Sequence, residues 1–370
     1  MALTNKRLCV FCGKAPDTKT REHVVPYWLL EATGDPTRVV PFGLNYAKNK
    51  KIIEYAWSAF AAPACESCNS AFSELEGRVK PIVEALMRRE AINVGAYVDL
   101  LDWLDKVRTG VWLIRHMIEQ HPIKITPHFH ISSRIGRKDR MVAVYVFDSD
   151  NKGINLFGSD SLIFNGMPSC FGFRINNILL LNASADFFCS KGCGLPHPAS
   201  MKLLMGGENS GKMKLEGISY EVEINHPVTD LKLFKPVVWL YQPIKLPSDN
   251  AVFQAGYYGH TNIFDSRIAS RTLEGNDRLG ALFRQYADHV EVLRNPDVAI
   301  EFESVTGEES AMQKDIAASV YDAQVNLFDS VQNEWIEPAQ PGEFDEAYRK
   351  ANLEDAAAHA QMYREAGSAV

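Results

Sequence analysis

Three short segments near the N-terminus contain residue types that bind metal ions and transfer protons. The first is the pair Cys9–Cys12, the second is Glu22–His23 in REHVVP, and the third is the pair Cys65–Cys68 followed by Asn69. Thiolates bind zinc, carboxylate and amide oxygens bind harder divalent ions, and an imidazole transfers protons near neutral pH. The chemistry of the chain depends on whether these segments form one site.

The two Cys-x-x-Cys pairs predict a structural zinc site. Each pair can place two thiolates on one ion from a tight turn, and the four sulfurs of Cys9, Cys12, Cys65 and Cys68 suit tetrahedral Zn²⁺. The 52 residues between the pairs exceed the spacing of a compact zinc ribbon, so we expect an inserted segment. The alternative is four unrelated buried or redox cysteines. A site closed by four cysteines would hold a structural ion.

Such a zinc ion would bring Glu22 and His23 close to Asn69. A carboxylate, an imidazole and an amide oxygen around one point are what a metal-dependent phosphodiesterase needs. Mg²⁺ or Mn²⁺ takes the oxygen ligands, and the histidine takes a proton from the attacking water.

These residues resemble the HNH endonucleases, which have a ββα-metal site. The resemblance is carried by EHVVP and CESCN with their cysteine pairs, and it covers roughly residues 7–80. It implies that His23 is the general base and that Glu22 and Asn69 bind the catalytic ion. The family commonly has Asp where this chain has Glu22. Its middle Asn, which braces the loop that orients the histidine, has no clear match, since Asn45 and Asn49 both lie in the right interval.

Each candidate also has a simpler interpretation. His23 would then be a hydrogen-bonded histidine beside the zinc, and Glu22 a surface carboxylate paired with Arg21. Asn69 would cap the helix that follows it. Glu76 of SELE, which we include among the candidate catalytic residues because it can reach back to the site, would be a solvated helix residue.

The local sequence predicts how Glu22 and His23 are held. We expect a strand anchored by Val24 and Val25, with a turn at Pro26. Because side chains alternate along a strand, both residues can reach one ion only at a twist, a bulge or the strand end.

Apolar periodicity predicts the remaining elements. From Phe72 onward, residues at helical spacing predict a helix that starts or kinks at Pro81, and a stronger helix, with Val107 in its apolar stripe, follows before Pro122. Runs at 141–147, 161–164, 171–175, 178–184, 218–224 and 236–242 predict a largely antiparallel sheet. We expect further helices at 277–293, 308–328 and 343–365.

The charge is unevenly distributed along the chain. The formal net charge is −7, yet residues 1–90 carry 13 Lys+Arg against 10 Asp+Glu, whereas residues 296–370 carry 4 against 16. This balance argues against a diffuse attraction to DNA but leaves room for a phosphate-binding surface. The sequence contains no long apolar run and no secretory leader, so we expect a cytoplasmic protein with reduced thiols and no membrane partner.

Together these features predict an α+β protein with three regions: an HNH domain at 1–90 with a four-cysteine zinc site, an α+β domain of unknown role at 91–295, and an acidic, mostly helical region at 296–370. The expected activity is metal-dependent cleavage of nucleic acid, for which we expect double-stranded DNA, in a defence or mobile-element setting with a partner or ligand as activator. The protein partners we expect are a second copy of the chain, in a homo-oligomer, or an activating protein. The alternative is a non-catalytic, zinc-stapled module that binds nucleic acid or protein.

Two weaker motifs occur later in the chain. Cys189, Cys193 and His197 could seed a second zinc site, although buried cysteines beside a chance histidine are the simpler interpretation. The basic run RIGRKDR, from Arg134 to Arg140, is either a phosphate contact or a solvated hairpin tip.

Overall fold

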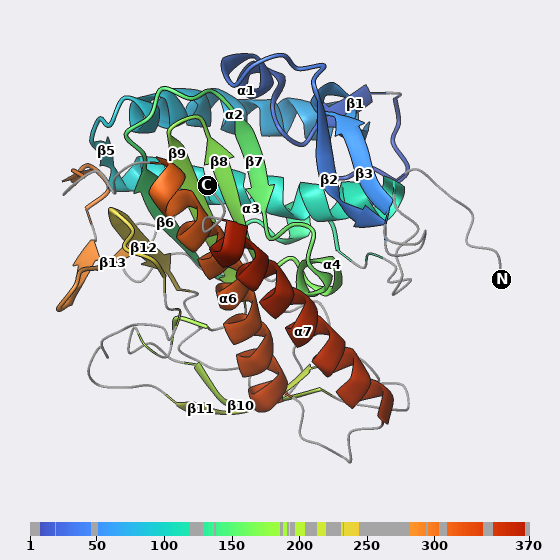
Figure 1. Cartoon of the computed structure of the whole chain (residues 1–370), viewed down its shortest axis with the longest axis vertical. Coiled ribbons are helices and arrows are strands. Elements are labelled where there is room, and N and C mark those ends of the chain that lie inside the picture. The colour runs from blue at the N-terminus through green and yellow to red at the C-terminus, as the bar shows by residue number, and fades with distance from the viewer. Residues whose placement is uncertain are drawn as a thin grey trace.

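The computed structural model describes residues 8–18, 20–45, 51–118, 127, 129–136, 138–185, 188–190, 192, 197–203, 213–219, 231, 233–243, 282–293, 295–302, 309–335 and 343–366. Over these residues the chain is a mixed α+β structure built on a seven-stranded antiparallel sheet (Figure 1). The expected α+β class and the antiparallel sheet are therefore confirmed. No helix among the described residues is long and apolar enough to cross a membrane.

The large sheet has the strand order β14-β13-β12-β6-β9-β8-β7, and every neighbouring pair is antiparallel. An Asn-Asn turn joins β8 and β9, as the sequence predicts. The strands are β6 (Asp139–Val146), β7 (Ile154–Phe157), β8 (Cys170–Ile175), β9 (Ile178–Ala185), β12 (Val238–Gln242), β13 (Leu282–Gln285) and β14 (Val290–Leu293).

The central strand β6 is buried on both faces. Val142 and Val144 belong to the core that the sheet shares with α3 (Val94–Ile118), whereas Met141 and Tyr145 belong to the core shared with α6 (Glu309–Trp335). This alternation follows from the two-residue period of a strand. The sheet thus lies between a helical layer on each face (Figure 1).

Helix α3 lies between the sheet and α2 (Glu66–Met87) and is buried over almost its whole central length. Its predicted apolar stripe is confirmed. Helix α2 begins six residues before Phe72 and contains Pro81 in its interior, so Pro81 does not start it. The helix tolerates this proline because Pro81 and Gly77, whose carbonyl loses its hydrogen bond, are both exposed and water can replace the lost donor.

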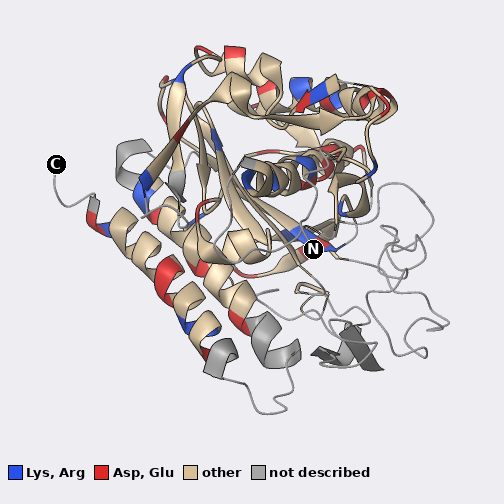
Figure 2. Cartoon of the chain, turned by 90° about the vertical axis from the view of Figure 1, so that its right-hand side faces the viewer, with Lys and Arg blue, Asp and Glu red and all other residues tan. Residues whose placement is uncertain are grey.

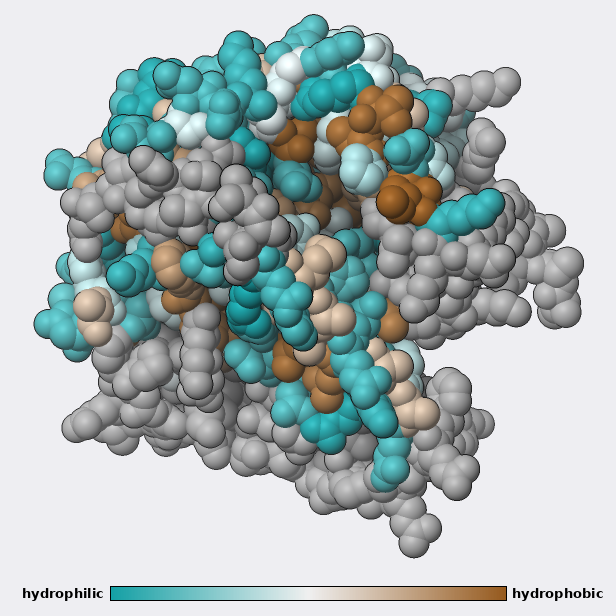
Figure 3. Space-filling model, viewed as in Figure 1, coloured by the Kyte–Doolittle hydropathy of each residue, from teal (hydrophilic) through white to brown (hydrophobic). Residues whose placement is uncertain are grey.

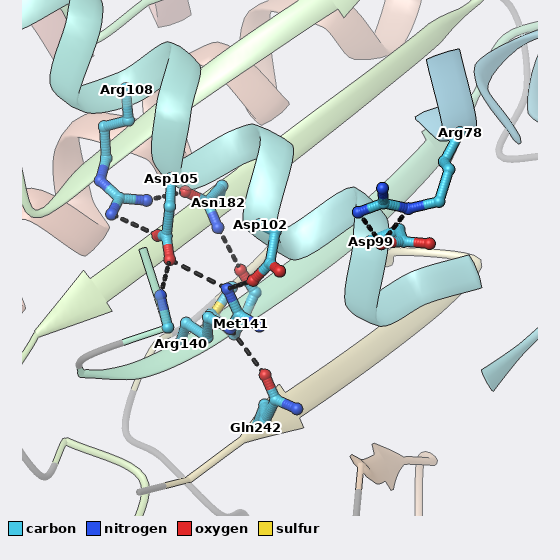
Figure 4. A network of polar contacts seen from close by, with 10 residues as sticks. Arg78, Asp99, Asp102, Asp105, Arg108, Arg140, Met141, Asn182 and Gln242 are labelled. Atoms are coloured by element: carbon cyan, nitrogen blue, oxygen red, sulfur yellow. Dashed lines mark hydrogen bonds and ion pairs between the residues drawn. The ribbon is translucent and has the colours of Figure 1, made fainter. Parts of the chain in front are cut away.

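A buried ionic network fastens α3 to the sheet (Figure 4). Asp105 accepts hydrogen bonds from Arg108 Nη2 at 2.6 Å and from Arg140 Nη1 at 3.0 Å, and Arg140 also pairs with Asp102 at 2.7 Å. Gln242 of β12 accepts from Arg140 Nε at 2.7 Å. Two aspartates and two arginines therefore balance their charges inside the protein.

Two predicted elements are wrong. Residues 161–164 do not form a strand: α4 (Leu162–Gly166) begins there because Ser161 Oγ caps it by accepting the Phe164 N–H at 3.0 Å. Over 282–293 the predicted helix at 277–293 is instead the hairpin β13–β14, since pairing with the edge of β12 outweighs local helical periodicity; residues 277–281 lie outside the described residues. Only the first two residues of the predicted strand at 218–224 lie in β11 (Met213–Ser219), and the rest fall outside the described residues.

The acidic C-terminal region forms the two predicted helices, α6 and α7 (Glu343–Ala366). Helix α6 covers the sheet, and α7 packs on α6 and α4, with acidic residues spread along the pair (Figure 2). Helix α7 therefore lies against the body of the protein on the side of α4, away from α1 and α2 (Figure 1).

The N-terminal region adds small elements above α3. The exposed side chains Val39 and Ile52 lie on a two-stranded ribbon, where brown atoms gather on the surface in Figure 3. The elements of this region are β1 (Thr20–His23), α1 (Tyr27–Ala32), β2 (Val39–Asn45), β3 (Lys51–Ala56), the 3-10 turn Trp57–Ala59, β4 (Ala61–Ala64) and β5 (Ile92–Asn93), which pairs with β15 (Ala299–Ile300); β10 (His197–Leu203) pairs with β11 elsewhere.

Candidate functional site

The four N-terminal cysteines converge on one point. The sulfurs of Cys9, Cys12, Cys65 and Cys68 all lie within 4.8 Å of one another. Cys12 Sγ and Cys65 Sγ are 3.8 Å apart, close to the roughly 3.8 Å that two thiolates adopt on one tetrahedral zinc with bonds of about 2.3 Å. The donor set and its spacing therefore fit a zinc ion. Among the described residues this is the cluster of His, Cys, Asp or Glu side chains whose ligand atoms meet in this way.

Two tight turns present these thiols. In the first, the Gly13 N–H donates to the Cys9 carbonyl at 2.9 Å, and Gly13 has a φ of +73°. A Cβ on Gly13 would lie 2.5 Å from the His130 ring, so only glycine fits. In the second, Cys65 is the N-cap of α2 and Cys68 lies in its first turn. The Cys65 N–H donates to Cys9 Sγ at 3.3 Å, which joins the two turns.

The first turn is also fixed to the rest of the molecule. The Val10 N–H donates to the Pro63 carbonyl at 2.9 Å, and the Val10 carbonyl accepts from Ile131 N at 3.1 Å. The Phe11 carbonyl accepts from Ser132 N at 3.0 Å. The buried ring of Phe11 stacks on Phe72 of α2 with 4.1 Å between centroids. The cysteine cluster therefore joins the N-terminal turn, β4, α2 and the segment before β6.

In the absence of a cation, the thiols of this cluster resist losing their protons together, because the resulting negative charges would repel one another. Burial and the neighbouring thiols raise the pKa of Cys65 to about 11 and that of Cys68 to about 12. Burial alone would raise the pKa of Cys9 as well, but backbone N–H donors from Cys12 and Cys65 lower it. Four crowded sulfurs cannot all carry negative charge, and a divalent ion would remove that penalty.

Around this cluster the chain forms a ββα unit. Strands β1 and β4 pair antiparallel with Glu22 opposite Ala62 and His23 opposite Ala61, and β4 runs directly into Cys65 and α2. The register is regular, so no bulge brings the Glu22 and His23 side chains to one side, although His23 is the last residue of β1. Val24 and Val25 lie beyond the strand and are buried, and the chain after Pro26 is the helix α1.

Glu22 faces inward and contacts Lys106 of α3. Its Oε1 is 2.5 Å from Lys106 Nζ, and the same ammonium group also pairs with Glu76 of α2. The Lys106 side chain is fully buried, whereas 10% of the Glu22 side chain and 18% of the Glu76 side chain are exposed. Glu22 is therefore not paired with Arg21, whose Nη2 donates to the Ala61 carbonyl at 2.9 Å.

The two carboxylates share one cation. Burial raises the pKa of Glu76, and the charge of Glu22 adds to that rise while Lys106 opposes it. The Lys106 ammonium also lies 6.0 Å from the centroid of the Phe11 ring, which belongs to the first cysteine turn. Glu76 is thus a partly buried member of an ionic cluster and not a solvated helix residue.

His23 lies on the opposite side of β1 from Glu22, as alternation along a strand requires. Its Nε2 is 3.1 Å from the Ser58 carbonyl, and its ring packs edge-on against Tyr27 at 5.9 Å between centroids. The Ser58 carbonyl accepts a hydrogen bond from the Nε2–H tautomer, which leaves Nδ1 as the proton acceptor. Ser58 thus orients this ring, and it lies between Glu22–His23 and Asn69, the part of the chain in which the resemblance would place the middle Asn.

Asn69 lies inside the first turn of α2 and does not cap it, because the helix begins at Glu66 with Cys65 as N-cap. Its N–H donates to the Cys65 carbonyl at 2.9 Å, and its carbonyl accepts from Ser73 Oγ at 2.9 Å. Its side-chain amide makes no hydrogen bond within the described part of the chain. An amide oxygen at this position is available to a ligand.

The structure therefore brings Glu22 and Glu76 together, with Lys106 between them. His23 and Asn69 lie on the same ββα unit without a side-chain contact to that pair among the described residues. Sequence reasoning missed Lys106, although a signal was present. At helical spacing it shares one face with Trp103 and Gly110, and a charge on such an apolar face needs a buried partner.

The weaker motifs do not form a second site in the described residues. Cys189 donates to the buried carboxylate of Asp139, with 3.2 Å between Sγ and Oδ2, and Cys193 lies outside those residues. In RIGRKDR, Lys138 and Arg140 are buried, and Arg134 stacks on the Phe129 ring at 3.9 Å. The described part of the run is not a solvated hairpin tip, because these three side chains are engaged within the protein; Arg137 lies outside the described residues.

Comparisons with known proteins give no relative for this chain: no protein-family model matches it, and no match was found among curated proteins or solved structures.

Proposed function

We propose that the chain is a metal-dependent, HNH-type endonuclease whose N-terminal ββα unit is held together by a structural zinc ion. The observation that carries this proposal is the order and pairing of β1, β4 and α2. Strand β1 ends in Glu22–His23 and pairs with β4, which continues through Cys65 into the helix that bears Asn69 and Glu76.

In this proposal His23 accepts the proton of the water that attacks phosphorus. The Ser58 carbonyl fixes the ring so that Nδ1 can act as the base, which is the arrangement general-base catalysis needs. Glu22 and Asn69 would supply the oxygen ligands for an exchangeable Mg²⁺ or Mn²⁺. Because Glu22 faces Lys106 and His23 lies on the other side of β1, the ion and the base would meet only at the end of this strand. When bound, that ion would stabilise the charge that develops on the phosphate and the leaving oxygen.

The proposed substrate is nucleic acid, and double-stranded DNA is the form we expect. The N-terminal region supplies the positive balance of charge, with 13 Lys+Arg against 10 Asp+Glu in residues 1–90. A pair of cuts on opposite strands would most simply use two copies of the chain. A defence or mobile-element role, with an activating protein or ligand acting on residues 91–370, also belongs to this proposal.

A second function is favoured by the position of Lys106. Because its ammonium contacts both Glu22 and Glu76, the ββα unit is stable with no divalent ion bound to these carboxylates. A zinc-stapled module that binds nucleic acid or a protein partner without cleaving it would need only this arrangement.

Plasmid cleavage in Mg²⁺ or Mn²⁺ separates the two functions. We expect the zinc-loaded chain to cleave, and we expect His23→Ala to lower the rate by about 10²- to 10⁴-fold with its zinc retained. The matched control is His289→Ala, which removes an exposed histidine from the β13–β14 turn and should leave the rate unchanged. Zinc content is measured in all three proteins.

The possible results lead to different conclusions. Cleavage that survives His23→Ala would place the active site elsewhere. A wild-type chain that holds zinc and binds DNA without cleaving it, in the presence of either ion, would favour the binding module.

A further inference from the structure

The Lys106 ammonium is a buried positive charge shared by two carboxylates. It is fully buried, contacts two carboxylates, and lies beside the aromatic ring of Phe11. Glu22 and Glu76 come from β1 and α2, two of the elements of the proposed active site, while Lys106 comes from α3 outside it. One positive charge therefore faces two negative charges at the inner side of the ββα unit.

We propose that Lys106 is a positioning residue that sets the affinity of this carboxylate pair for a divalent cation. It holds Glu22 and Glu76 through one oxygen of each, since the contacts run to Oε1 in both residues. Oε2 of Glu22 makes no polar contact in the described part of the chain. This inference rests on the proposed function, because the ion concerned is the one that Glu22 would bind there.

The charge balance gives the direction of the effect. With Lys106 present the three side chains carry a net charge of −1 when all are ionised, and without it two carboxylates would face each other at −2. Hard divalent ions bind oxygen ligands more tightly as the charge of the ligand set grows. Lys106 therefore keeps the ion weakly held and exchangeable, and it replaces the ion as counter-charge when none is bound.

Four proteins test this inference through the affinity for Mn²⁺, measured by calorimetry on the zinc-loaded chain without nucleic acid. Lys106→Met, which leaves −2, should bind Mn²⁺ at least about tenfold more tightly than the wild type. Glu76→Gln, which leaves 0, should bind it at least about tenfold more weakly. The double variant with both changes returns to −1 and should resemble the wild type.

This order of affinities is a readout that damage to the fold would not produce, because a loosened site binds an ion less tightly. Lys80→Met is the matched control, since Lys80 lies on α2 over the Trp28 ring, 5.8 Å from its centroid, and outside the cluster. It should leave Mn²⁺ affinity unchanged. Zinc content verifies that the cysteine cluster is intact in each variant.

The inference is overturned if Lys106→Met binds Mn²⁺ no more tightly than the wild type while retaining zinc. If Lys106→Met does not fold, Glu76→Gln decides, because an unchanged Mn²⁺ affinity in that charge-balanced variant contradicts the inference equally. The proposed nuclease fails by a different result: ordered Mn²⁺ affinities without any cleavage by the wild type would leave Lys106 in its role and remove the enzyme.

Discussion

Asp105 and Lys106, which are neighbours on α3, belong to two different ionic clusters. One cluster is balanced in charge, and the other has more negative than positive groups. Asp105 points to the sheet, where it and Asp102 meet Arg108 and Arg140 (Figure 4). Lys106 points to the ββα unit, where it meets two glutamates. Successive residues of a helix are about 100° apart, so one helix can serve both sides.

The cluster around Asp105 is balanced and well supplied with partners. Burial alone would raise the pKa of Asp105, but the guanidiniums of Arg108 and Arg140 keep it below its usual range. The Gly136 N–H donates to its second oxygen at 3.0 Å, and Arg108 Nε donates to the Pro168 carbonyl at 2.8 Å. Such a network fixes the packing of α3 on the sheet. Its charges balance, so it leaves no excess of negative charge for a cation, although Arg140 Nη2 is buried without a hydrogen-bond partner among the described residues.

The cluster around Lys106 lacks this balance. Two carboxylates share one ammonium, the pKa of Glu76 is raised mainly by burial, and the carboxylates come from the elements that carry the sequence motifs. The difference teaches that a buried network with balanced charges serves to hold the fold together. A network with excess negative charge beside a sequence motif is instead a place where a bound cation would lower the electrostatic free energy.

Loss of the proposed zinc ion should have the largest effect, because it should destabilise the region around Lys106 and leave the region around Asp105 folded. Structural zinc contributes about 10 kcal/mol or more in zinc-finger peptides, and Phe11, which lies beside Lys106, belongs to the first cysteine turn. Cys68→Ala should therefore lose zinc, and amide hydrogen exchange should show lost protection in β1, β4 and the start of α2. Protection of β6 and β9 beside Asp105 should persist.

The control for that experiment is Cys170→Ala, which removes a buried thiol of β8 outside the cluster. It should keep the zinc content of the wild type. Equal loss of protection at β6 and β1 in Cys68→Ala would show that the two clusters unfold as one unit and that the contrast between them has no consequence for stability.

The second largest effect is expected at Asp105. Asp105→Asn keeps the shape of the side chain but leaves Arg108 and Arg140 with Asp102 as their remaining carboxylate. Because uncompensated buried charge is costly, the free energy of unfolding should fall by about 3–5 kcal/mol, measured by urea denaturation.

A matched pair on the same helix gives the control. Asp99 pairs with Arg78 at 3.1 Å, but the Arg78 side chain is 54% exposed. Asp99→Asn should cost less than about 1 kcal/mol. Equal losses from the two variants would contradict the assignment of Asp105 to a stabilising network.

Gly110 tests how closely α3 approaches the ββα unit. It lies one turn after Lys106, and a Cβ there would be 2.8 Å from both methyl groups of Val24. Gly110→Ala should therefore destabilise the protein by about 1–3 kcal/mol through overpacking, although alanine favours helices.

Gly77→Ala is the control, since a Cβ on this exposed glycine of α2 would meet nothing within 4 Å. That variant should be more stable than the wild type by about 0.5–1 kcal/mol, from urea denaturation under the same conditions. A stabilising Gly110→Ala would mean that α3 and Val24 are not in close contact.

The contrast between the clusters also shows what the sequence could predict. The Cys-x-x-Cys spacing within each pair predicts a four-sulfur cluster because two such pairs together suit one shared ion, and the apolar stripe around Val107 predicts α3 because that pattern is local. The sequence identifies His23 as a candidate general base only through the resemblance carried by EHVVP. Its hydrogen bond to the Ser58 carbonyl could not be predicted, because a backbone carbonyl leaves no signal in the sequence.

The sequence does not reveal which residues far apart in the chain pair with each other. Lys106 and Glu22 are 84 residues apart, and nothing near either residue identifies its partner. The apolar residues of the hairpin β13–β14 fit the period of a helix as well as that of a strand, so the sequence predicts a helix there. The strand conformation is selected by pairing with β12, a distant part of the chain. The C-terminal helices were predicted correctly, but one partly buried polar side chain through which α7 contacts the rest of the protein was not.

That side chain is His359, and its protonation gives the smallest predicted effect. Its Nε2 is 3.5 Å from Asp160 Oδ2, its Nδ1 is 2.8 Å from the Asp355 carbonyl, and its ring stacks on Tyr321 at 5.1 Å between centroids. Burial alone would lower the pKa of His359, but the Asp160 carboxylate and Asp355 raise it to about 9. Burial keeps the pKa of Tyr321 well above its usual value, so this neighbour stays uncharged.

Because the pKa of His359 in the folded state lies above its ordinary value, the charged form stabilises the docking of α7. This stabilisation is complete below about pH 6.5 and is lost as the pH rises through about 9. After allowance for solvent screening, the loss should be about 1 kcal/mol in the free energy of unfolding. His359→Gln should remove this part of the pH dependence, whereas His289→Gln, at an exposed turn beside Asp288, should leave it in place. If both variants keep the wild-type profile, the docking of α7 does not depend on the charge of His359. It then rests on its apolar contacts and on its other polar contacts, such as Arg349–Asp329 and Arg364–Asp322.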